Sequence, residues 1–189
     1  MIDIALTFLQ NELQTFLFNR TRSGAIQVKL SKISTETGSY AFPTDTIALS
    51  VINIEEERTF KSQLPEYTYK NGQHIQLEPE LKLCIHLIVA ANFTSYGESL
   101  KMISHVLTFF QSHQRFTSIE FPALDREVGK ITAELLSPSY EQLNQIWSYI
   151  GSKQLPSVFY KLRLVVIQND AVSTVQPPLT TIITNLSGK

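Results

Sequence analysis

The sequence from Leu136 to Ile167, LSPSYEQLNQIWSYIGSKQLPSVFYKLRLVVI, contains a complete helix signal, a complete strand signal and a short connection between them. Ser137 is a good N-cap residue, and Pro138 suits the first helical position, where its missing N–H has no intrahelical partner to lose. Apolar residues then recur at helical spacing up to Gly151, which offers a stop. From Val158 onward, β-branched and aromatic residues favour a strand. A helix followed at once by a long apolar strand is typical of an α/β or α+β domain.

The composition indicates one domain that other chains partly cover. The chain has 189 residues, of which 43% are hydrophobic and 17% charged, and its formal net charge is −1. This length allows a single domain with a substantial core. The low charged fraction leaves fewer solvating side chains than usual, so we expect part of the surface to be buried against other proteins. The absence of a basic excess gives no support for a nucleic-acid partner.

The N-terminal sequence and the lone cysteine bear on the cellular compartment. No apolar stretch approaches the roughly 18 residues that a membrane-spanning helix needs, so we expect no membrane insertion. Asp3 stands where a signal peptide would carry positive charge. Cys84 lies in an apolar run, which favours a small core residue over a nucleophile. These features fit a protein of the reducing cytoplasm.

The start of the chain predicts a helix and two strands. A stripe of leucine and phenylalanine residues predicts a helix over residues 2–19. Alternating residues predict a short strand from Ile26 to Leu30. The stretch from Thr46 to Ile54 has apolar residues on both faces, which indicates a strand that is covered on both sides.

Residues 55–80 are unusual because they have no stable period and contain two prolines and a glycine. A structureless loop of that length is uncommon inside a compact domain. We therefore expect an extended arm or hairpin that packs on a neighbouring subunit. Tyr67, Tyr69 and Ile75 would supply the contact.

The middle of the chain predicts another strand and helix. The stretch from Leu81 to Ala91 is the strongest strand signal. Ser95 and Glu98 form a capping-box pattern ahead of a helix that is expected to end near His113. The apolar stripe expected to face the core of this helix consists of Tyr96, Leu100, Ile103, Leu107 and Phe110.

The remaining elements complete an α+β prediction. Short strands are expected within Phe116–Phe121 and over Lys130–Leu136, ahead of the helix and strand described first. A tail from residue 169 contains Pro177 and Pro178, and its part from Leu179 to Leu186 is suited to add a strand to a partner. We expect one α+β domain over residues 1–168, with a mixed, mainly antiparallel sheet packed by two or three helices, and an extended tail over residues 169–189.

Catalytic and metal-binding patterns are weak throughout the sequence. Nucleophile-elbow, phosphate-loop, dinucleotide-binding and zinc-protease motifs do not occur in it. His105 and His113 are eight residues apart on a predicted helix, which is too far to share an ion. We therefore expect a non-enzyme with no cofactor and no metal. An enzyme whose site is assembled from distant residues, such as His86, Glu134 and Arg163, is the alternative.

Two features suggest contacts with partners. Glu55, Glu56 and Glu57 follow a predicted strand, and adjacent residues in a strand point to opposite faces, so they are poorly placed for acid–base catalysis. They are interpreted either as a contact for a basic patch on a partner or as a solvated strand end. Trp147 is expected in the core, with an exposed interface anchor as the alternative.

Three blocks of sequence together resemble a known family. They are residues 47–60 (IALSVINIEEERTF), residues 81–111 (LKLCIHLIVAANFTSYGESLKMISHVLTFFQ) and residues 136–167. The matching positions are Asn53, Tyr96, Trp147, Pro156, Ser157 and Tyr160. In this order, the blocks resemble the tail-terminator or cap proteins of extracellular contractile injection systems, which are phage-tail-like particles.

The resemblance implies a structural role. Such proteins form a hexameric ring at the baseplate-distal end of the tube and sheath, where the ring ends polymerisation and joins sheath to tube. The implied partners are further copies of the chain and the tube and sheath proteins. The particle would be assembled in the cytoplasm and then released or docked at a membrane.

The arm and the tail are the candidate segments for such contacts, and the expected contact residues lie in both. In the arm these are Glu55, Glu56, Glu57, Tyr67 and Tyr69. In the tail they are Pro177, Pro178 and Ile182. A neck, adaptor or baseplate component of the same kind of particle, or a small non-catalytic protein-binding domain, is the alternative function.

Overall fold

The computed structural model describes residues 1–57, 66–70, 73–77, 81–166 and 174–176, with side chains over residues 1–57 and 82–164. The described residues form three helices and nine strands. In chain order these are α1 (Ile2–Thr21), β1 (Gln27–Leu30), β2 (Thr46–Glu56), β3 (Glu66–Lys70), β4 (Gln73–Leu77), β5 (Leu81–Asn92), α2 (Tyr96–Ser112), β6 (Arg115–Thr117), β7 (Lys130–Leu136), α3 (Tyr140–Ile150), β8 (Ser157–Val166) and β9 (Thr174–Gln176).

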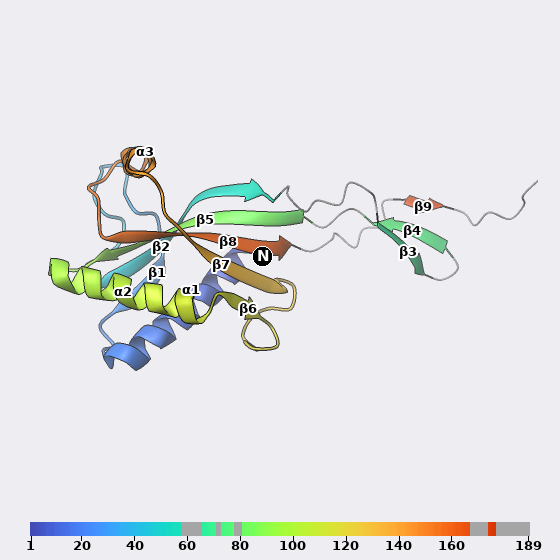
Figure 1. Cartoon of the computed structure of the whole chain (residues 1–189), viewed down its shortest axis with the longest axis horizontal. Coiled ribbons are helices and arrows are strands. Elements are labelled where there is room, and N and C mark those ends of the chain that lie inside the picture. Colours follow the sequence, from blue (N-terminus) through green and yellow to red (C-terminus); the bar gives the residue numbers. More distant parts are fainter. Residues whose placement is uncertain (58–65, 71–72, 78–80, 167–173, 177–189) are drawn as a thin grey trace, which may run out of the picture.

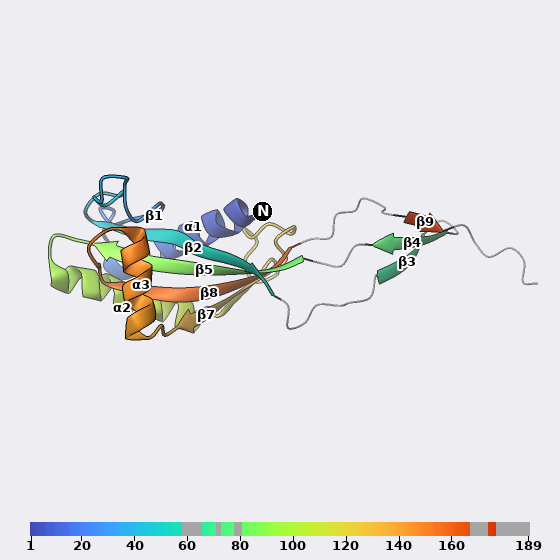
Figure 2. The same ribbon diagram turned by 90° about the horizontal axis from the view of Figure 1, so that it is seen from above.

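Six of the strands form one sheet in the order β1-β2-β5-β8-β7-β6. The β1–β2 pair is parallel and every other pair in this sheet is antiparallel. A second sheet, β3-β4-β9, lies beyond the ends of β2, β5 and β8 (Figures 1 and 2). The α+β prediction with a mixed, mainly antiparallel sheet is confirmed, and the segment expected to form an arm or hairpin contains the antiparallel β3–β4 pair.

The helices cover the two faces of the six-stranded sheet unequally. Helices α1 and α2 lie on one face, and α3 alone crosses the other (Figures 1 and 2). The α1/α2 face holds the larger core, in which Leu9, Leu13, Ile85, Leu87 and Phe109 are almost completely buried. Burial of this apolar surface supplies most of the stability of the domain.

Aromatic rings join the larger core together. The centroid of the Phe109 ring lies 5.3 Å from that of Phe16, 4.9 Å from that of Phe110 and 5.8 Å from that of Phe116. The Phe110 ring lies 4.2 Å from that of Tyr160 on β8. These contacts tie both helices to the sheet at favourable aromatic distances.

The core on the α3 face is smaller. Trp147, 6% exposed, packs with Ala48, Ile88, Ala90 and Phe159 of the sheet. The expectation that Trp147 is a core residue is therefore confirmed. Its indole Nε1 is buried without a hydrogen-bond partner among the described residues.

The N-terminal caps of the last two helices differ from the sequence prediction. Helix α3 begins at Tyr140 with Ser139, not Ser137, as its N-cap, so Pro138 lies outside the helix. Ser139 Oγ accepts from the N–H of Gln142, while Gln142 Oε1 accepts from the N–H of Ser139. This reciprocal capping box outweighs the preference of proline for the first helical position. At α2, Ser95 is the N-cap but makes no side-chain capping bond, so the capping box with Glu98 is not formed.

The predicted core stripe of α2 is confirmed at Ile103 and Phe110, which are buried, and at Leu107, which packs partly buried against the core, but it is wrong at its first two positions. Tyr96 is 69% exposed and Leu100 45% exposed. The buried residues of α2 are Ser99, Met102, Ile103, Val106, Phe109 and Phe110. Two stripes of similar apolar content exist in this segment, and the aromatic cluster selects the one that contains Phe109. The short strand expected within Phe116–Phe121 is limited to β6, Arg115–Thr117.

The two edges of the six-stranded sheet also differ. At the β1 edge, Gln14 Nε2 donates to Ile26 O at 2.9 Å and Gln14 Oε1 accepts from Val28 N at 2.7 Å. Gln10 Nε2 donates to Val28 O at 2.9 Å. Side chains of α1 therefore occupy the outward main-chain groups of Val28 and the carbonyl of Ile26. Such occupation prevents another strand from pairing there.

Candidate interaction face

The half of the α3 face that α3 does not cover carries a cluster of charged residues. The cluster lies on the sheet surface toward the small sheet and crosses four strands. Its members are Glu55 on β2, Glu57 directly after β2, His86 on β5, Lys161 and Arg163 on β8, and Glu134 on β7. We call these six residues the charged cluster.

A β-bulge brings the two glutamates onto this face. In the pairing of β2 with β5, Val51 lies opposite Leu87 and Asn53 opposite His86, so Ile52 is the extra residue. Before the bulge, the odd-numbered residues of β2 face α1 and α2. The extra residue reverses this parity, so Glu55 and Glu57 share the face of His86.

The charged cluster is held by short contacts across the strands. His86 Nε2 lies 3.0 Å from Glu55 Oε1, and Lys161 Nζ lies 3.4 Å from the same oxygen. Arg163 bridges two strands, with Nε 3.4 Å from Glu57 Oε2 and Nη2 3.0 Å from Glu134 Oε2. Glu55 and Glu57 thus meet basic residues of their own chain, an arrangement that neither sequence interpretation included.

The protonation of these groups follows from their neighbours. The hydrogen bond with His86 and the one with Lys161 lower the pKa of Glu55, so its carboxylate stays ionised at neutral pH. Burial raises the pKa of the Cys84 thiol, and its hydrogen bond to Glu57 adds to this. Cys84 is therefore an inert core thiol rather than a nucleophile, as the sequence predicted.

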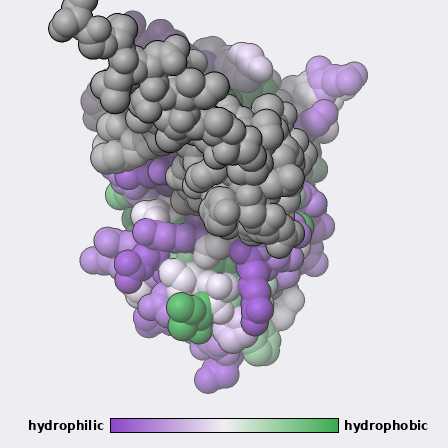
Figure 3. Space-filling view, turned by 90° about the vertical axis from the view of Figure 1, so that its right-hand side faces the viewer, coloured by the Kyte–Doolittle hydropathy of each residue, from purple (hydrophilic) through white to green (hydrophobic). Residues whose placement is uncertain are grey.

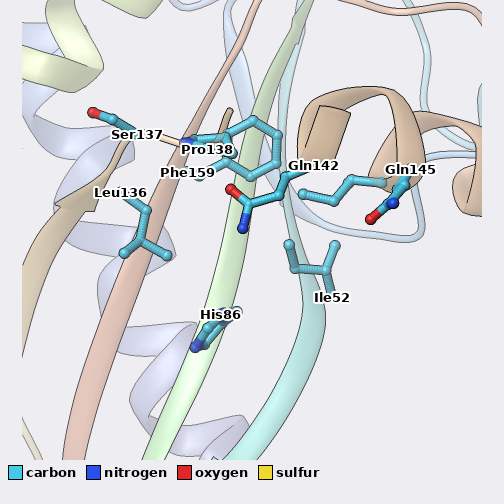
Figure 4. Close-up of a pocket in the computed structure, with 9 residues that line it drawn as sticks. Ile52, His86, Leu136, Ser137, Pro138, Gln142, Gln145 and Phe159 are labelled. Atoms are coloured by element: carbon cyan, nitrogen blue, oxygen red, sulfur yellow. The ribbon is translucent and has the colours of Figure 1, made fainter. Parts of the chain in front are cut away.

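A shallow groove of about 360 Å³ lies between the charged cluster and α3 (Figure 4). Gln142 and Gln145 of α3 lie on one side, Leu136 to Pro138 lie on the other, and Ile52 and His86 lie on the sheet below. Most of the lining is apolar. The groove therefore suits contact with an apolar side chain flanked by polar groups.

The residues named for the enzyme alternative do not converge on this groove. Arg163 and Glu134 pair with each other, and of the three only His86 lines the groove. In the described ranges, His, Cys, Asp and Glu side chains nowhere gather in a group of three or more that could hold a metal ion. Every helix that the structure describes is too short or too polar to cross a bilayer.

The residues expected at contacts are divided among several places. Glu55 and Glu56 are the last two residues of β2, and Glu57 follows directly. Tyr67 and Tyr69 lie on β3, where they pair with Gln76 and His74 of β4. Pro177, Pro178 and Ile182 lie outside the described residues. The space-filling view of this end of the molecule shows a mostly hydrophilic described surface (Figure 3).

The family-like positions are mainly structural. Pro156 O accepts from Ala91 N at 3.0 Å, and Ser157 begins β8, so this pair joins β5 to β8. Asn53 is exposed directly after the bulge, Tyr96 is exposed, and Tyr160 is buried against Phe110. Sequence reasoning missed Lys161 and its partnership with Glu55 because strand order is not visible in a sequence.

Comparison with known proteins relates this fold to injection-system components. No protein of curated function matches the sequence. A solved structure described as the sheath/tube terminator of the extracellular contractile injection system PVC, in the extended state, is similar over 94% of this chain and 64% of that chain, with a TM-score of 0.57 and 13% identity. The tube terminating cap of the anti-feeding prophage is similar over 94% of this chain and 60% of that chain, with a TM-score of 0.61 and 12% identity.

These likenesses are ones of fold, and this chain spans less than two thirds of the length of either solved chain. The family evidence comes from the sequence model described as the Pvc16 N-terminal domain, which matches residues 5–181. The resemblance carried by the three sequence blocks is therefore confirmed, and this chain belongs to the Pvc16 N-terminal domain family.

Proposed function

We propose that this chain is a structural cap, or tail terminator, of a contractile injection system. It forms a hexameric ring on the baseplate-distal end of the tube and sheath, ends polymerisation there and joins sheath to tube. The observation that carries the proposal is the family match over residues 5–181, together with the fold shared with two terminator structures over 94% of the chain.

The physical problem that such a protein solves is the termination of an open stack. A tube is a heterologous assembly in which each ring offers an interface for the next. A cap must copy the subunit interface on one side and offer no continuing interface on the other. The closed β1 edge supports the proposal, because a strand edge whose main-chain groups are occupied does not pair with a further subunit.

The proposed partners are other copies of this chain and the tube and sheath proteins. The domain over residues 1–168 forms the body of the ring, and the arm and the tail from residue 169 contact neighbours. We propose assembly in the cytoplasm as part of the particle, without catalytic activity. Extended segments that add strands to a neighbouring sheet bind mainly through the main chain, which suits a repeated ring contact.

The first test is the mass of the full chain by light scattering during size-exclusion chromatography, with electron micrographs of the peak. A six-membered ring is expected. The second test is co-expression with the tube protein, with tube length as the readout. Tubes of uniform, capped length support the proposal, whereas unchanged length distributions and a monomeric chain in the presence of tubes would overturn it.

A further inference from the structure

The outer edge of β7 is partly open, in contrast to the β1 edge. Strand β6 pairs only with Lys130 to Thr132, and Gln114 O accepts from Ala133 N at 2.9 Å. Outward and inward main-chain groups alternate in an antiparallel strand. The N–H and C=O of Leu135 therefore also point away from β8, and neither has a hydrogen-bond partner among the described residues.

A groove of about 650 Å³ runs beside this open edge, between β7 and α2. Leu107 and Phe110 of α2, Leu135 of β7 and Tyr160 of β8 supply its apolar lining. The side chain of Leu135 is 51% exposed beside this groove. An open edge beside an apolar groove provides both main-chain hydrogen bonds and pockets for alternate side chains.

The hydroxyl of Tyr160 is a polar group that this groove leaves without a partner. The residue is 2% exposed and lines the groove, and its hydroxyl makes no hydrogen bond within the described residues. Burial raises the pKa of Tyr160 to about 12, so the hydroxyl remains a donor at neutral pH. A donor at the wall of this groove can pair with a ligand that carries acceptor oxygens, such as a main-chain carbonyl or a threonine hydroxyl.

We propose that residues 179–184 of a neighbouring copy add to the β7 edge as a further strand, with Leu179 and Ile183 in the groove. This inference rests on the proposed ring, because the ring places a second copy beside each chain. It identifies the strand-accepting site within that ring, from Ala133 to Leu136. It also assigns the tail, whose partner the sequence left open, to a defined edge.

The sequence of the tail supports this occupant. Residues 179–184 read Leu-Thr-Thr-Ile-Ile-Thr, which is rich in β-branched residues and has no charge. In a strand, positions 179, 181 and 183 share one face and present two large apolar side chains to a groove. Pro177 and Pro178 precede the segment, and they separate it from β9 because proline cannot continue a ladder.

The first test is disulfide trapping between two populations of full-length chains. One population carries Leu135→Cys, and the other carries a cysteine at one position from 179 to 184 in turn. Oxidation is followed by non-reducing electrophoresis. We expect covalent dimers with cysteines at positions 179, 181 and 183, which share the face of Leu135, and weak products at 180, 182 and 184.

The matched control for trapping is Tyr149→Cys in place of Leu135→Cys. Tyr149 is 88% exposed on α3, on the opposite face of the sheet, and should give little dimer with any tail position. Equal yields at all six tail positions, or absence of dimer, would overturn the added strand. Trapping only when both cysteines are in one chain would overturn the second copy as its source.

The second test separates the strand from the ring. Leu135→Pro removes the outward main-chain N–H of position 135 without removing a hydrogen bond to β8. Leu135→Val keeps this N–H and serves as the control. Loss of the hydrogen bond and the leucine contact should weaken ring assembly by about tenfold or more, measured as the concentration of half-assembly. If the proline variant forms rings normally, the added strand is refuted and the proposed ring is not. If disulfide trapping alternates along the tail but the oligomers are not hexamers, the hexamer is refuted and the added strand is not.

Discussion

The closed and open sides of this sheet differ in what their side chains do. The closed side consists of the α1/α2 face and the β1 edge, where apolar residues fill the core and Gln10 and Gln14 occupy the strand edge. The open side consists of the charged half of the α3 face and the β7 edge beside its groove. The difference suggests that one side of the molecule provides stability while the other is available for contacts.

The largest expected effect lies on the closed side. Phe109→Ala removes a 2% exposed ring that contacts Phe16, Phe110 and Phe116. We expect a loss of about 4–5 kcal/mol in the free energy of unfolding, measured by denaturant titration, because neighbouring helices prevent collapse of the cavity. Phe109→Leu, which keeps much of the volume, should lose less than half of this. Equal losses for both variants would show that the specific ring contacts of Phe109, rather than the volume of its side chain, carry the effect.

The smaller core on the other face should respond less. Trp147→Ala is expected to cost about 3 kcal/mol, near the lower end for a buried tryptophan, because its Nε1 has no described partner to lose. Trp147→Phe should recover most of this stability. A loss as large as that of Phe109→Ala would break the comparison of the two faces, and a negligible loss would place Trp147 outside the core.

The closed edge can be opened by one substitution. Gln14→Ala leaves Ile26 O and Val28 N without their partners. We expect a destabilisation of about 1–3 kcal/mol, because two partly buried main-chain groups lose hydrogen bonds. Self-association that increases with concentration should appear in light scattering. The control Asn11→Ala changes an exposed position of the same helix and should be nearly neutral; comparable association of both variants would argue against the edge.

The smallest effect is expected in the charged cluster. The pKa of Glu55 is lowered by His86 and Lys161, so its stabilising contribution is present above the ordinary glutamate pKa of 4.5 and is lost as the pH falls through the lowered value. Since Glu55 is 44% exposed, Glu55→Gln should cost less than about 1 kcal/mol at neutral pH.

The pH dependence checks this assignment. The stability difference between the native chain and Glu55→Gln should shrink as the pH is lowered below 4.5, because the native carboxylate then becomes neutral. Glu36→Gln, in an exposed loop position, serves as the matched control for the loss of one carboxylate. A difference that grows toward acid would contradict the sign derived from the lowered pKa.

Local patterns in the sequence were sufficient for most elements. The apolar stripe of the first helix, the alternation through Ile85, Leu87 and Val89, and the stop at Gly151 each depend on residues within a few positions of one another. Gly151 indeed ends α3 with φ 72°, a conformation that glycine adopts without steric cost. Elements of this kind follow from periodicity and backbone preference, which a single sequence carries.

The N-cap of α3 and part of the core stripe of α2 were predicted wrongly, because two local signals of similar strength competed in each segment. Ser137 and Ser139 both precede a helical stretch, and only the reciprocal bonds with Gln142 select Ser139. The two stripes of α2 are similarly matched, and packing against Phe16 and Phe116 selects the one with Phe109. Such choices depend on partners that lie far away in the sequence.

The sequence determined that this is a low-charge α+β chain with a Trp-bearing helix, long apolar strands and the marks of the Pvc16 N-terminal domain family. The tertiary structure determined which of these residues meet. The bulge at Ile52 turns Glu55 toward His86, and the strand order brings Lys161 to the same carboxylate. One extra residue reverses the alternation of a strand, and strand order depends on long-range pairing, so neither could be inferred from local periodicity.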